Sequence, residues 1–215
     1  MILALSAAAL AFIANFSAVQ IPERYGEALV NRYPGWAVMN RRSAWALLDI
    51  VVRPDGSITF CRVAASGGSD RLAKEFCRII WNIRLEPARA ADATPVHGHT
   101  RLSMAFYSPG GREARDVVAL RREPDITIDV EGAPLTAEGR RPGFGVAITV
   151  EPDGTVTDCQ EGHELYLRAS EPSAPVPAAL VEQACRQVTG TKRGRIVADD
   201  GTAVPYVGVL HVRPQ

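Results

Sequence analysis

The side chains in this sequence that could do chemistry are few, and the histidines come first. There are four histidines, and only His97 and His99 stand close together. On an extended segment, side chains two residues apart share a face, which is a geometry that metal ligands use. No pair of carboxylates lies near them in the sequence to complete a site. A solvated start of a strand is therefore the simpler interpretation of this pair.

Other catalytic patterns are incomplete. The stretch 66–69 (SGGS) lacks the Gly-x-Ser-x-Gly pattern of a nucleophile elbow, and a helix cap explains it better. Gly143 and Gly145 are followed by no third glycine that leads into a helix, so a dinucleotide-binding loop is not supported. The paired acids Asp199 and Asp200 are typical of a turn. The sequence thus predicts no catalytic residues, no metal site and no cofactor.

An internal repeat organises the elements that carry these residues. Residues 52–61 (VRPDGSITFC) match residues 150–159 (VEPDGTVTDC), 98 positions further on. The later match of Cys77-Arg78 with Cys185-Arg186 spans 108 positions, so the second copy contains an insertion of ten residues. The Pro-rich stretch 171–177 (EPSAPVP) is the obvious place for it. Two copies of one module are the simplest account.

The first copy begins with the signals of a β-hairpin. Residues 44–52 are apolar and become β-branched, Pro54-Asp55-Gly56 is a turn, and residues 57–63 alternate in polarity. Proline fixes φ in such a turn, aspartate accepts local backbone hydrogen bonds, and glycine supplies the left-handed residue. The two runs are therefore expected to pair as antiparallel strands.

A helix and a last strand follow the hairpin. The stretch 66–70 breaks the strand, and Ser69 or Asp70 can cap a helix. Pro87 ends that segment, and residues 100–106 alternate as a third strand. The helix would bury an apolar stripe formed by Leu72, Phe76, Ile79 and Ile80. This copy is therefore predicted to be a ββαβ unit.

The second copy has the same order of elements. Its hairpin is expected at residues 145–150 and 155–159, its helix at residues 178–188 and its last strand at residues 204–212. The predicted fold class is α+β, with two tandem ββαβ modules. In each module, one helix packs on one face of an antiparallel sheet.

The domain boundaries follow from the repeat. The modules span residues 44–107 and 143–215, and a linker over residues 108–142 joins them. Within this linker, the alternating stretch 125–130 (DITIDV) predicts one extra strand. A shorter linker, residues 20–43, precedes the first module.

The N-terminal residues 1–19 contain no charged side chain. Such a run is typical of a secretory signal peptide or of a single membrane anchor. No Lys or Arg precedes its apolar core, as a signal peptide normally requires. The candidate cleavage residues are Ala14 and Ala18, but in each case a Phe occupies the other position at which the A-x-A-like cleavage motif requires a small residue. A buried first helix fits less well, because no polar face interrupts the run, and a misplaced start codon is a further account. Export is the expectation.

Each copy holds two cysteines, one at the end of the second hairpin strand and one in the helix. A helix packed across its own hairpin brings these elements together. Of the three pairings that four cysteines allow, the repeat selects Cys61 with Cys77 and Cys159 with Cys185. Four reduced, buried cysteines in a cytoplasmic protein are the alternative. A zinc site is not indicated, because no CxxC spacing occurs.

The charges exclude one class of partner. The 24 Lys and Arg residues balance the 24 Asp and Glu residues, whereas proteins that bind nucleic acid carry a basic excess. The balance hides an asymmetry, since the chain up to Tyr107 carries a net charge of +4 and the remainder carries −4. No nucleic acid is therefore expected as a partner, and the two copies have diverged in partner or dock against each other.

The order of motifs in the first copy resembles the C-terminal domain of TonB-like energy-transducing proteins. The resemblance covers residues 45–107 well, and the cysteine-bearing form is similar to periplasmic TonB-family proteins of some α-proteobacteria. It covers residues 145–213 in part, because the second copy lacks counterparts of Ser66-Gly67 and Glu86-Pro87-Ala88. The matching motifs are the PDG turn, Cys61-Arg62-Val63, Ala65-Ser66-Gly67, Leu72, Cys77-Arg78, residues 83–88 (IRLEPA) and a strand ending in Phe106.

The resemblance implies a peptide-binding module. Members of this family pair an extended peptide of an outer-membrane transporter against an edge strand. Such pairing relies on backbone hydrogen bonds and leaves no catalytic signature. The strand carried over from the family consists of Thr100, Arg101, Leu102, Ser103, Met104, Ala105 and Phe106. The outward residues of this strand would be Arg101, Ser103 and Ala105.

The expected function is that of a non-enzymatic periplasmic protein. It would bind an extended peptide of an outer-membrane receptor, with a link to transmembrane transport, or of another envelope protein. It would meet the membrane only through residues 1–19, either before cleavage or as an inner-membrane anchor. The linker of residues 20–43 is too short and too poor in proline to cross the periplasm, so energy transduction by this chain alone is not expected.

Two alternatives to peptide binding remain open. One is an envelope enzyme whose site forms between the repeats and uses His97, His99 or His163, which requires these histidines to converge with acids in a cleft. The other is a purely structural pair of domains.

Overall fold

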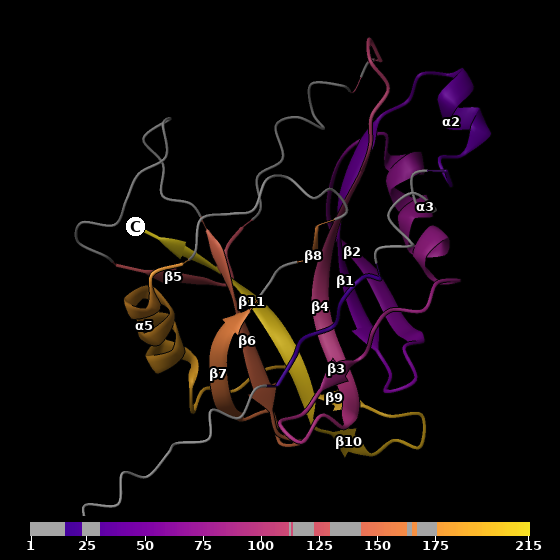
Figure 1. Cartoon of the computed structure of the whole chain (residues 1–215). Helices are drawn as coiled ribbons and strands as arrows, with labels where there is room; N and C mark the ends of the chain where they lie inside the picture. The colour runs from indigo at the N-terminus through magenta and orange to yellow at the C-terminus, as the bar shows by residue number, and fades with distance from the viewer. Residues whose placement is uncertain are drawn as a thin grey trace, which may run out of the picture.

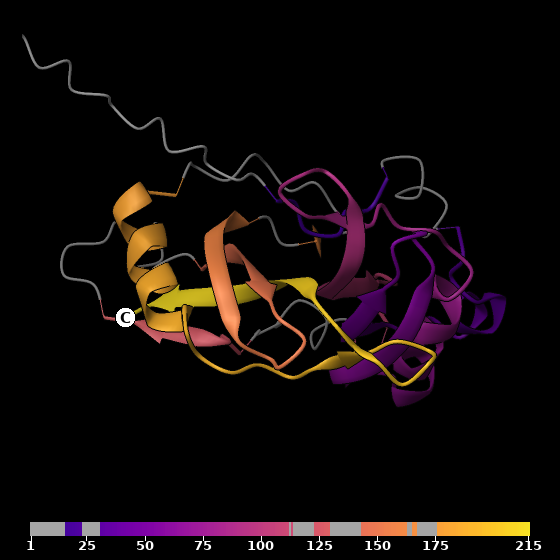
Figure 2. The ribbon, with the colours of Figure 1, turned by 90° about the horizontal axis from the view of Figure 1, so that it is seen from below.

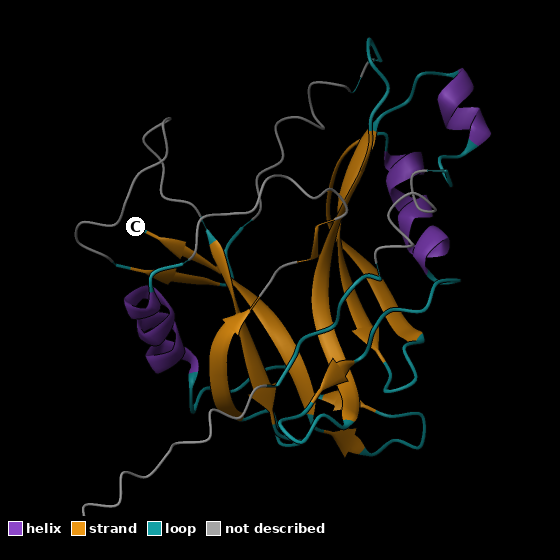
Figure 3. Ribbon diagram, in the orientation of Figure 1, coloured by secondary structure: helices purple, strands orange, loops and turns teal. Residues whose placement is uncertain are grey.

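The computed structural model describes residues 16–22, 31–111, 113, 123–129, 143–162, 165–166 and 176–215. Its fold is mixed α+β, with one large sheet on which helices pack (Figure 1). The fold class predicted from the sequence is thereby confirmed. In Figure 3 the strands run through the middle of the molecule and the helices lie at its two ends. No helix within the described ranges is long and apolar enough to cross a membrane.

The first module has the predicted ββαβ order. Its sheet runs β2-β1-β4, with β1 antiparallel to both neighbours. A short helix, α2 (Gly35–Met39), precedes it. The elements of the module are β1 (Ala44–Val52), β2 (Ile58–Gly68), α3 (Asp70–Ile80), β3 (Ala88–Arg89) and β4 (Pro95–Phe106).

The second module repeats this order. Its sheet runs β11-β6-β7, and all its neighbouring strands are antiparallel. The predicted linker strand is present as β5 (Ile126–Ile128). The other elements are β6 (Phe144–Val150), β7 (Val156–Gly162), β8 (Leu165–Tyr166), α5 (Ala178–Val188), β9 (Ile196–Val197), β10 (Ala203–Val204) and β11 (Tyr206–Pro214).

The PDG turns have the same construction in both modules. The Asp55 carboxylate accepts hydrogen bonds from the backbone N–H and the hydroxyl of Ser57, at 2.9 and 2.6 Å. Asp153 binds Thr155 in the same way, at 2.8 and 2.6 Å. Beyond each helix, the chain returns to the turn, where the N–H of Leu85 donates to the carbonyl oxygen of Gly56 at 2.9 Å. The repeat therefore specifies this contact as well as the hairpin.

The two modules share one sheet, which the sequence did not indicate. The last strands β4 and β11 pair in parallel through three residue pairs, from Tyr206 opposite His97 to Gly208 opposite His99. They then separate (Figure 1), and short strands occupy the sides facing the gap, with β8 parallel to β4 and β5 parallel to β11. The antiparallel sheets of the two modules are therefore parts of a single mixed sheet.

The helices α3 and α5 cover opposite faces of this sheet and stand at opposite ends of it (Figure 2). Ala147 and Val207 of the second module belong to the hydrophobic core under α3. Val146, Ile148 and Leu210 belong to the core under α5. Because side chains alternate between the faces of a strand, these two sets point in opposite directions. A two-fold rotation about an axis parallel to β4 and β11 keeps the direction of the strands and exchanges the two faces of the sheet. Such a rotation therefore accounts both for the parallel pairing of these equivalent strands and for the placement of the two helices on opposite faces.

The chain segment 16–21 closes the join between the modules on the α3 face. Phe16 and Val19 are buried in the core that also holds Ala147 and Val207. The backbone of this segment exchanges hydrogen bonds with Arg89 and Glu86. The last residues of the predicted signal or anchor segment thus take part in the fold, whereas residues 1–15 lie outside the described ranges.

One local boundary differs from the prediction. The stretch 66–70 was expected to break the second strand, yet β2 continues to Gly68 and α3 starts at Asp70. Trp45 of β1 lies over Gly67, where a Cβ would come within 2.2 Å of the indole Nε1. The glycine therefore serves close packing inside a continuing strand and does not end it.

Both predicted disulfides are present, and no described cysteine is free. Cys61 and Cys77 have their Cα atoms 5.7 Å apart, and Cys159 and Cys185 have theirs 5.3 Å apart. Both distances lie in the usual range for a disulfide. Each bond ties a helix to the outer strand of its hairpin, which is the pairing that the repeat selects.

We expect all four cysteines to resist a maleimide under denaturing conditions until a reductant is added, and then to give four adducts by mass spectrometry. Replacing Cys61 and Cys77 together by alanine should lower the free energy of unfolding by about 2–4 kcal/mol, as measured by chemical denaturation. Labelling of the protein before reduction would contradict the bonding pattern.

Gly56 provides a test of the contact between the PDG turn and the chain beyond the helix. It has φ +82°, and a Cβ there would lie 2.3 Å from the carbonyl oxygen of Leu85. Gly56→Ala should therefore lose about 2 kcal/mol or more in the free energy of unfolding. Gly110 also has a positive φ but meets nothing within 4 Å, so Gly110→Ala is the matched control and should cost clearly less. Equal losses in the two variants would refute the contact.

Candidate functional site

The strand carried over from the family, Thr100 to Phe106, lies inside the sheet. It forms most of β4, which pairs with β1 along one side. On the other side, His97 to His99 pair with β11, and Leu102 and Ser103 pair with β8. Within the predicted strand, Leu102 and Ser103 are therefore already paired on this side, and the described residues provide no pairing partner there for the other five.

Arg101, one of the expected outward residues, belongs instead to a chain of ion pairs that crosses the sheet. Asp49 on β1 is only 3% exposed and accepts hydrogen bonds from Arg62 at 2.6 Å and from Arg101 Nε at 2.9 Å. Arg101 also pairs with Asp125, whose carboxylate accepts the backbone N–H of His211 on β11 at 2.8 Å. The chain connects β2 in the first module to β11 in the second.

This environment sets the ionisation of Asp49. Burial by itself would raise the pKa of the carboxyl group, but the hydrogen bonds from Arg62 and Arg101 outweigh it and hold the pKa below its usual value. A carboxylate that is already bound by two guanidinium groups is poorly suited to act as a general base. The series of ion pairs is therefore a structural feature that joins the modules.

Among the described residues, His97 and His99 do not converge on an acid that lacks an ion-pair partner. Burial lowers the pKa of His99, whose ring lies edge-on to Tyr206 at a centroid distance of 6.4 Å. Burial also lowers the pKa of His97, which lies near the pair formed by Arg53 and Asp199. His163 lies outside the described ranges. In the part of the chain that the structure describes, no group of three or more His, Cys, Asp or Glu side chains could hold a metal ion.

The longest open edge in the described part of the chain belongs to β2. On one side, nine of its eleven residues pair in register with β1, and no described residue pairs with the other side. Arg62 is the only charged residue in the strand. Natural proteins usually protect an exposed edge with charges, prolines or short strands, and β2 relies only on two β-bulges. The sequence carries this signal in the small, uncharged stretch 64–68 (AASGG), but the overlapping stretch 66–70 was predicted to break the strand.

Two exposed aromatic side chains flank this edge, one on each face. The Cys61–Cys77 disulfide joins β2 to α3, and Trp81 lies one turn beyond Cys77 on the same side of the helix. Phe60 precedes Cys61 and therefore projects from the opposite face of the strand. Phe60 is 45% exposed and Trp81 is 48% exposed. A strand added along β2 would find an apolar contact on either face.

The corresponding edge in the second module is shorter and acidic. β7 has seven residues, which include Asp158 and Glu161. In addition, the side-chain amide of Gln160 donates a hydrogen bond to the carbonyl oxygen of Phe16, so the segment near the N-terminus already contacts this strand. The β7 edge is thus protected in ways that the β2 edge is not.

No protein-family model, curated protein or solved structure matches this chain. The function is therefore argued from the geometry of its own residues. The two disulfides fit an oxidising compartment, such as the space outside the cytoplasm.

Asp49 gives a test of the ion-pair chain that joins the modules. Asp49→Asn should lower the free energy of unfolding at pH 7 by about 3 kcal/mol, because it removes the negative charge from two arginines at a buried position. Because folding lowers the pKa of Asp49, its contribution is present above about pH 4 and is lost as the pH falls through the lower folded-state value. In chemical denaturation at pH 7, 5 and 3, the free energy of unfolding should therefore fall less between pH 7 and pH 3 in the variant than in the wild type.

The exposed Glu161→Gln serves as the control for this measurement and should leave the pH dependence almost unchanged. If Asp49→Asn has wild-type stability at pH 7, the series of ion pairs does not hold the modules together.

Proposed function

We propose that this protein binds an extended peptide by β-strand addition along the outer edge of β2. The main observation behind the proposal is that this edge is long and almost uncharged. It spans Ile58 to Gly68, and Arg62 is its only charged residue. Backbone N–H and C=O groups on such an edge can pair with any extended chain, whatever its side chains. The proposal therefore requires no catalytic residue.

The flanking side chains provide the selectivity that backbone pairing lacks. A peptide strand beside β2 points alternate side chains toward the two faces, so one set meets Phe60 and the other meets Trp81 and the disulfide of Cys61. Aromatic groups of this kind contribute much of the binding energy when they become buried at an interface. Bulky apolar residues at alternate positions of the peptide are the expected preference.

Charge favours an acidic peptide at this edge. The solvent-facing side of α3 carries the exposed Arg71, Lys74 and Arg78, and the first module as a whole is basic. Long-range attraction to a basic surface speeds the encounter with an acidic segment. By contrast, the acidic β7 edge of the second module would repel the same peptide.

The proposal agrees with the resemblance to TonB-like domains in its mode of binding and differs from it in the strand used. The protein would act in the periplasm, on an extended segment of an outer-membrane receptor or of another envelope protein. Its two disulfides support an oxidising compartment, and the choice of the periplasm rests on the apolar N-terminal residues and the family resemblance. Strand addition at β2 in place of β4 follows from the pairing of β4 with β11 and β8.

A phage-displayed library of random decapeptides supplies the probe for this proposal. A selected peptide, added to the 15N-labelled full chain, should shift the backbone amides of β2 and slow their hydrogen exchange. Phe60→Ala and Trp81→Ala should each weaken binding about tenfold in fluorescence anisotropy, because each removes an exposed aromatic contact. Tyr107→Ala is the matched control, since Tyr107 is exposed to a similar extent, 44%, but does not belong to β2 or α3.

Shifts confined to another surface, or failure of the library to yield any peptide that shifts β2, would reject strand addition and favour a structural role. Concentration-dependent pairing of β2 between two copies of the chain, seen by sedimentation, would identify a second copy as the occupant and would also reject the peptide.

A further inference from the structure

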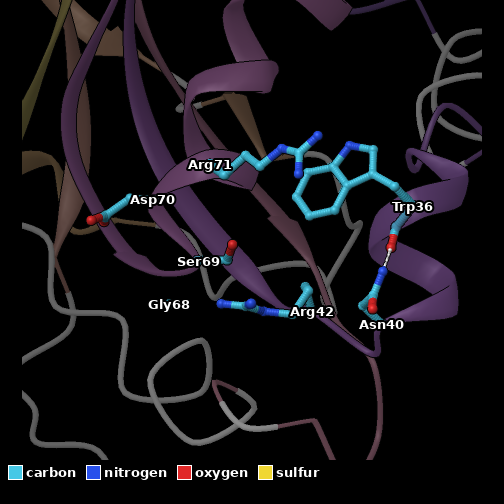
Figure 4. Close-up of a pocket in the computed structure, with 7 residues that line it drawn as sticks. All are labelled: Trp36, Asn40, Arg42, Gly68, Ser69, Asp70 and Arg71. Atoms are coloured by element: carbon cyan, nitrogen blue, oxygen red, sulfur yellow. Dashed lines mark hydrogen bonds between the residues drawn. The ribbon is translucent and has the colours of Figure 1, made fainter.

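A pocket lies where β2 ends and α3 begins (Figure 4). It has a volume of about 470 Å³. Its walls come from α2, from the end of β2 and from the first turn of α3, so it continues the open edge beyond the last residue of the strand. The residues that line it are Trp36, Asn40, Arg42, Gly68, Ser69, Asp70 and Arg71.

Ser69 contributes to this pocket a hydroxyl group that is not used to cap α3. The residue is only 3% exposed, and its side chain makes no capping hydrogen bond although it precedes the first residue of α3. In Figure 4 its hydroxyl points into the space between Arg42 and Arg71. A residue at this position normally bonds to a backbone N–H of the first helical turn. Both the hydroxyl and the N–H groups of that turn are consequently available to a ligand.

Arg71 provides positive charge beside that hydroxyl, and Arg42 provides a second guanidinium group whose charge is balanced by Glu113. The guanidinium of Arg71 lies 4.1 Å from the ring centroid of Trp36, a contact that fixes its position without neutralising its charge. Arg42 pairs with Glu113, yet its Nε is buried and has no hydrogen-bond partner among the described residues. Asp70 also lines the pocket, but its carboxylate points away from Trp36 and Arg71 (Figure 4).

We propose that this pocket binds a carboxylate, and specifically the C-terminal carboxylate of the peptide that adds to β2. The choice of a peptide terminus rests on the proposed function, whereas the preference for a carboxylate rests on the pocket alone. The N-terminal end of a helix and nearby arginines favour a negative group. A peptide parallel to β2 ends at Gly68 and delivers its C-terminus to the pocket, whereas an antiparallel peptide would bring its ammonium group there.

The second module offers an internal comparison. Helix α5 corresponds to α3 residue by residue, but Pro177, Ala178 and Ala179 occupy the positions of Ser69, Asp70 and Arg71. These residues offer no hydroxyl and no positive charge. The second module therefore lacks the carboxylate site as well as an open neutral edge.

The test uses a library peptide displayed with a free C-terminus and then synthesised both as the free acid and as the C-terminal amide. On the full chain, the free acid should bind at least about tenfold more tightly than the amide in fluorescence anisotropy, as expected for charge-assisted hydrogen bonds. Ser69→Ala and Arg71→Gln should remove most of this difference. Arg78→Gln, also exposed on α3 but outside the pocket, is the matched control and should keep it.

A second probe separates this inference from the proposed function. Acetyl-glycylglycine is too short to form a strand, and its free acid should shift the amides of Ser69 to Leu72 in 15N-labelled protein whereas its amide should not. If acid and amide peptides bind β2 equally well, the carboxylate site is rejected and strand addition stands. If the short acid shifts the pocket while no peptide shifts β2, strand addition is rejected and the carboxylate site stands. If neither occurs, both are rejected.

Discussion

The parallel pairing of β4 with β11 is the constraint on which the remaining features of this molecule depend. Each strand is the last of its module and would otherwise be an exposed edge, with unpaired backbone groups along one side. Pairing them closes part of each edge and joins two three-stranded sheets into one, while β8 and β5 pair with the two strands further along. It also places α3 and α5 on opposite faces, and it leaves β2 and β7 as the outer strands.

Only three residue pairs join β4 to β11, so the join requires other support. Segment 16–21 covers it on one face, where Phe16 and Val19 become buried. The chain of ion pairs from Arg62 through Asp49 and Arg101 to Asp125 supports it on the other face. The join is thus stabilised by backbone hydrogen bonds, by burial of apolar side chains and by ion pairs. None of the residues that provide this support belongs to the repeated motifs.

The two copies have kept the same scaffold and diverged at their free surfaces. The PDG turn, the disulfide and the contact that follows the helix are present in both. The outer strand is long and nearly uncharged in the first copy, whereas it is short and acidic in the second. The start of the helix carries Ser69 and Arg71 in the first copy, and Pro177 and Ala179 in the second. The opposite net charges of the two halves accompany this divergence of the outer strands.

The sequence by itself determined the parts of this protein that depend on short-range patterns. Turn chemistry placed both PDG hairpins and apolar periodicity placed α3. The repeat placed α5 and identified both disulfides. Each of these signals involves residues that are close in sequence or duplicated in it. Only the tertiary structure decided which strand edges remain open. The motif around Thr100 to Phe106 is local, but β11 pairs with His97 to His99 just before it and β8 pairs with Leu102 and Ser103 within it, and no local pattern encodes the placement of these distant strands. The same applies to Ser69 and Arg71, which acquire a shared pocket only when α2 packs beside the first turn of α3.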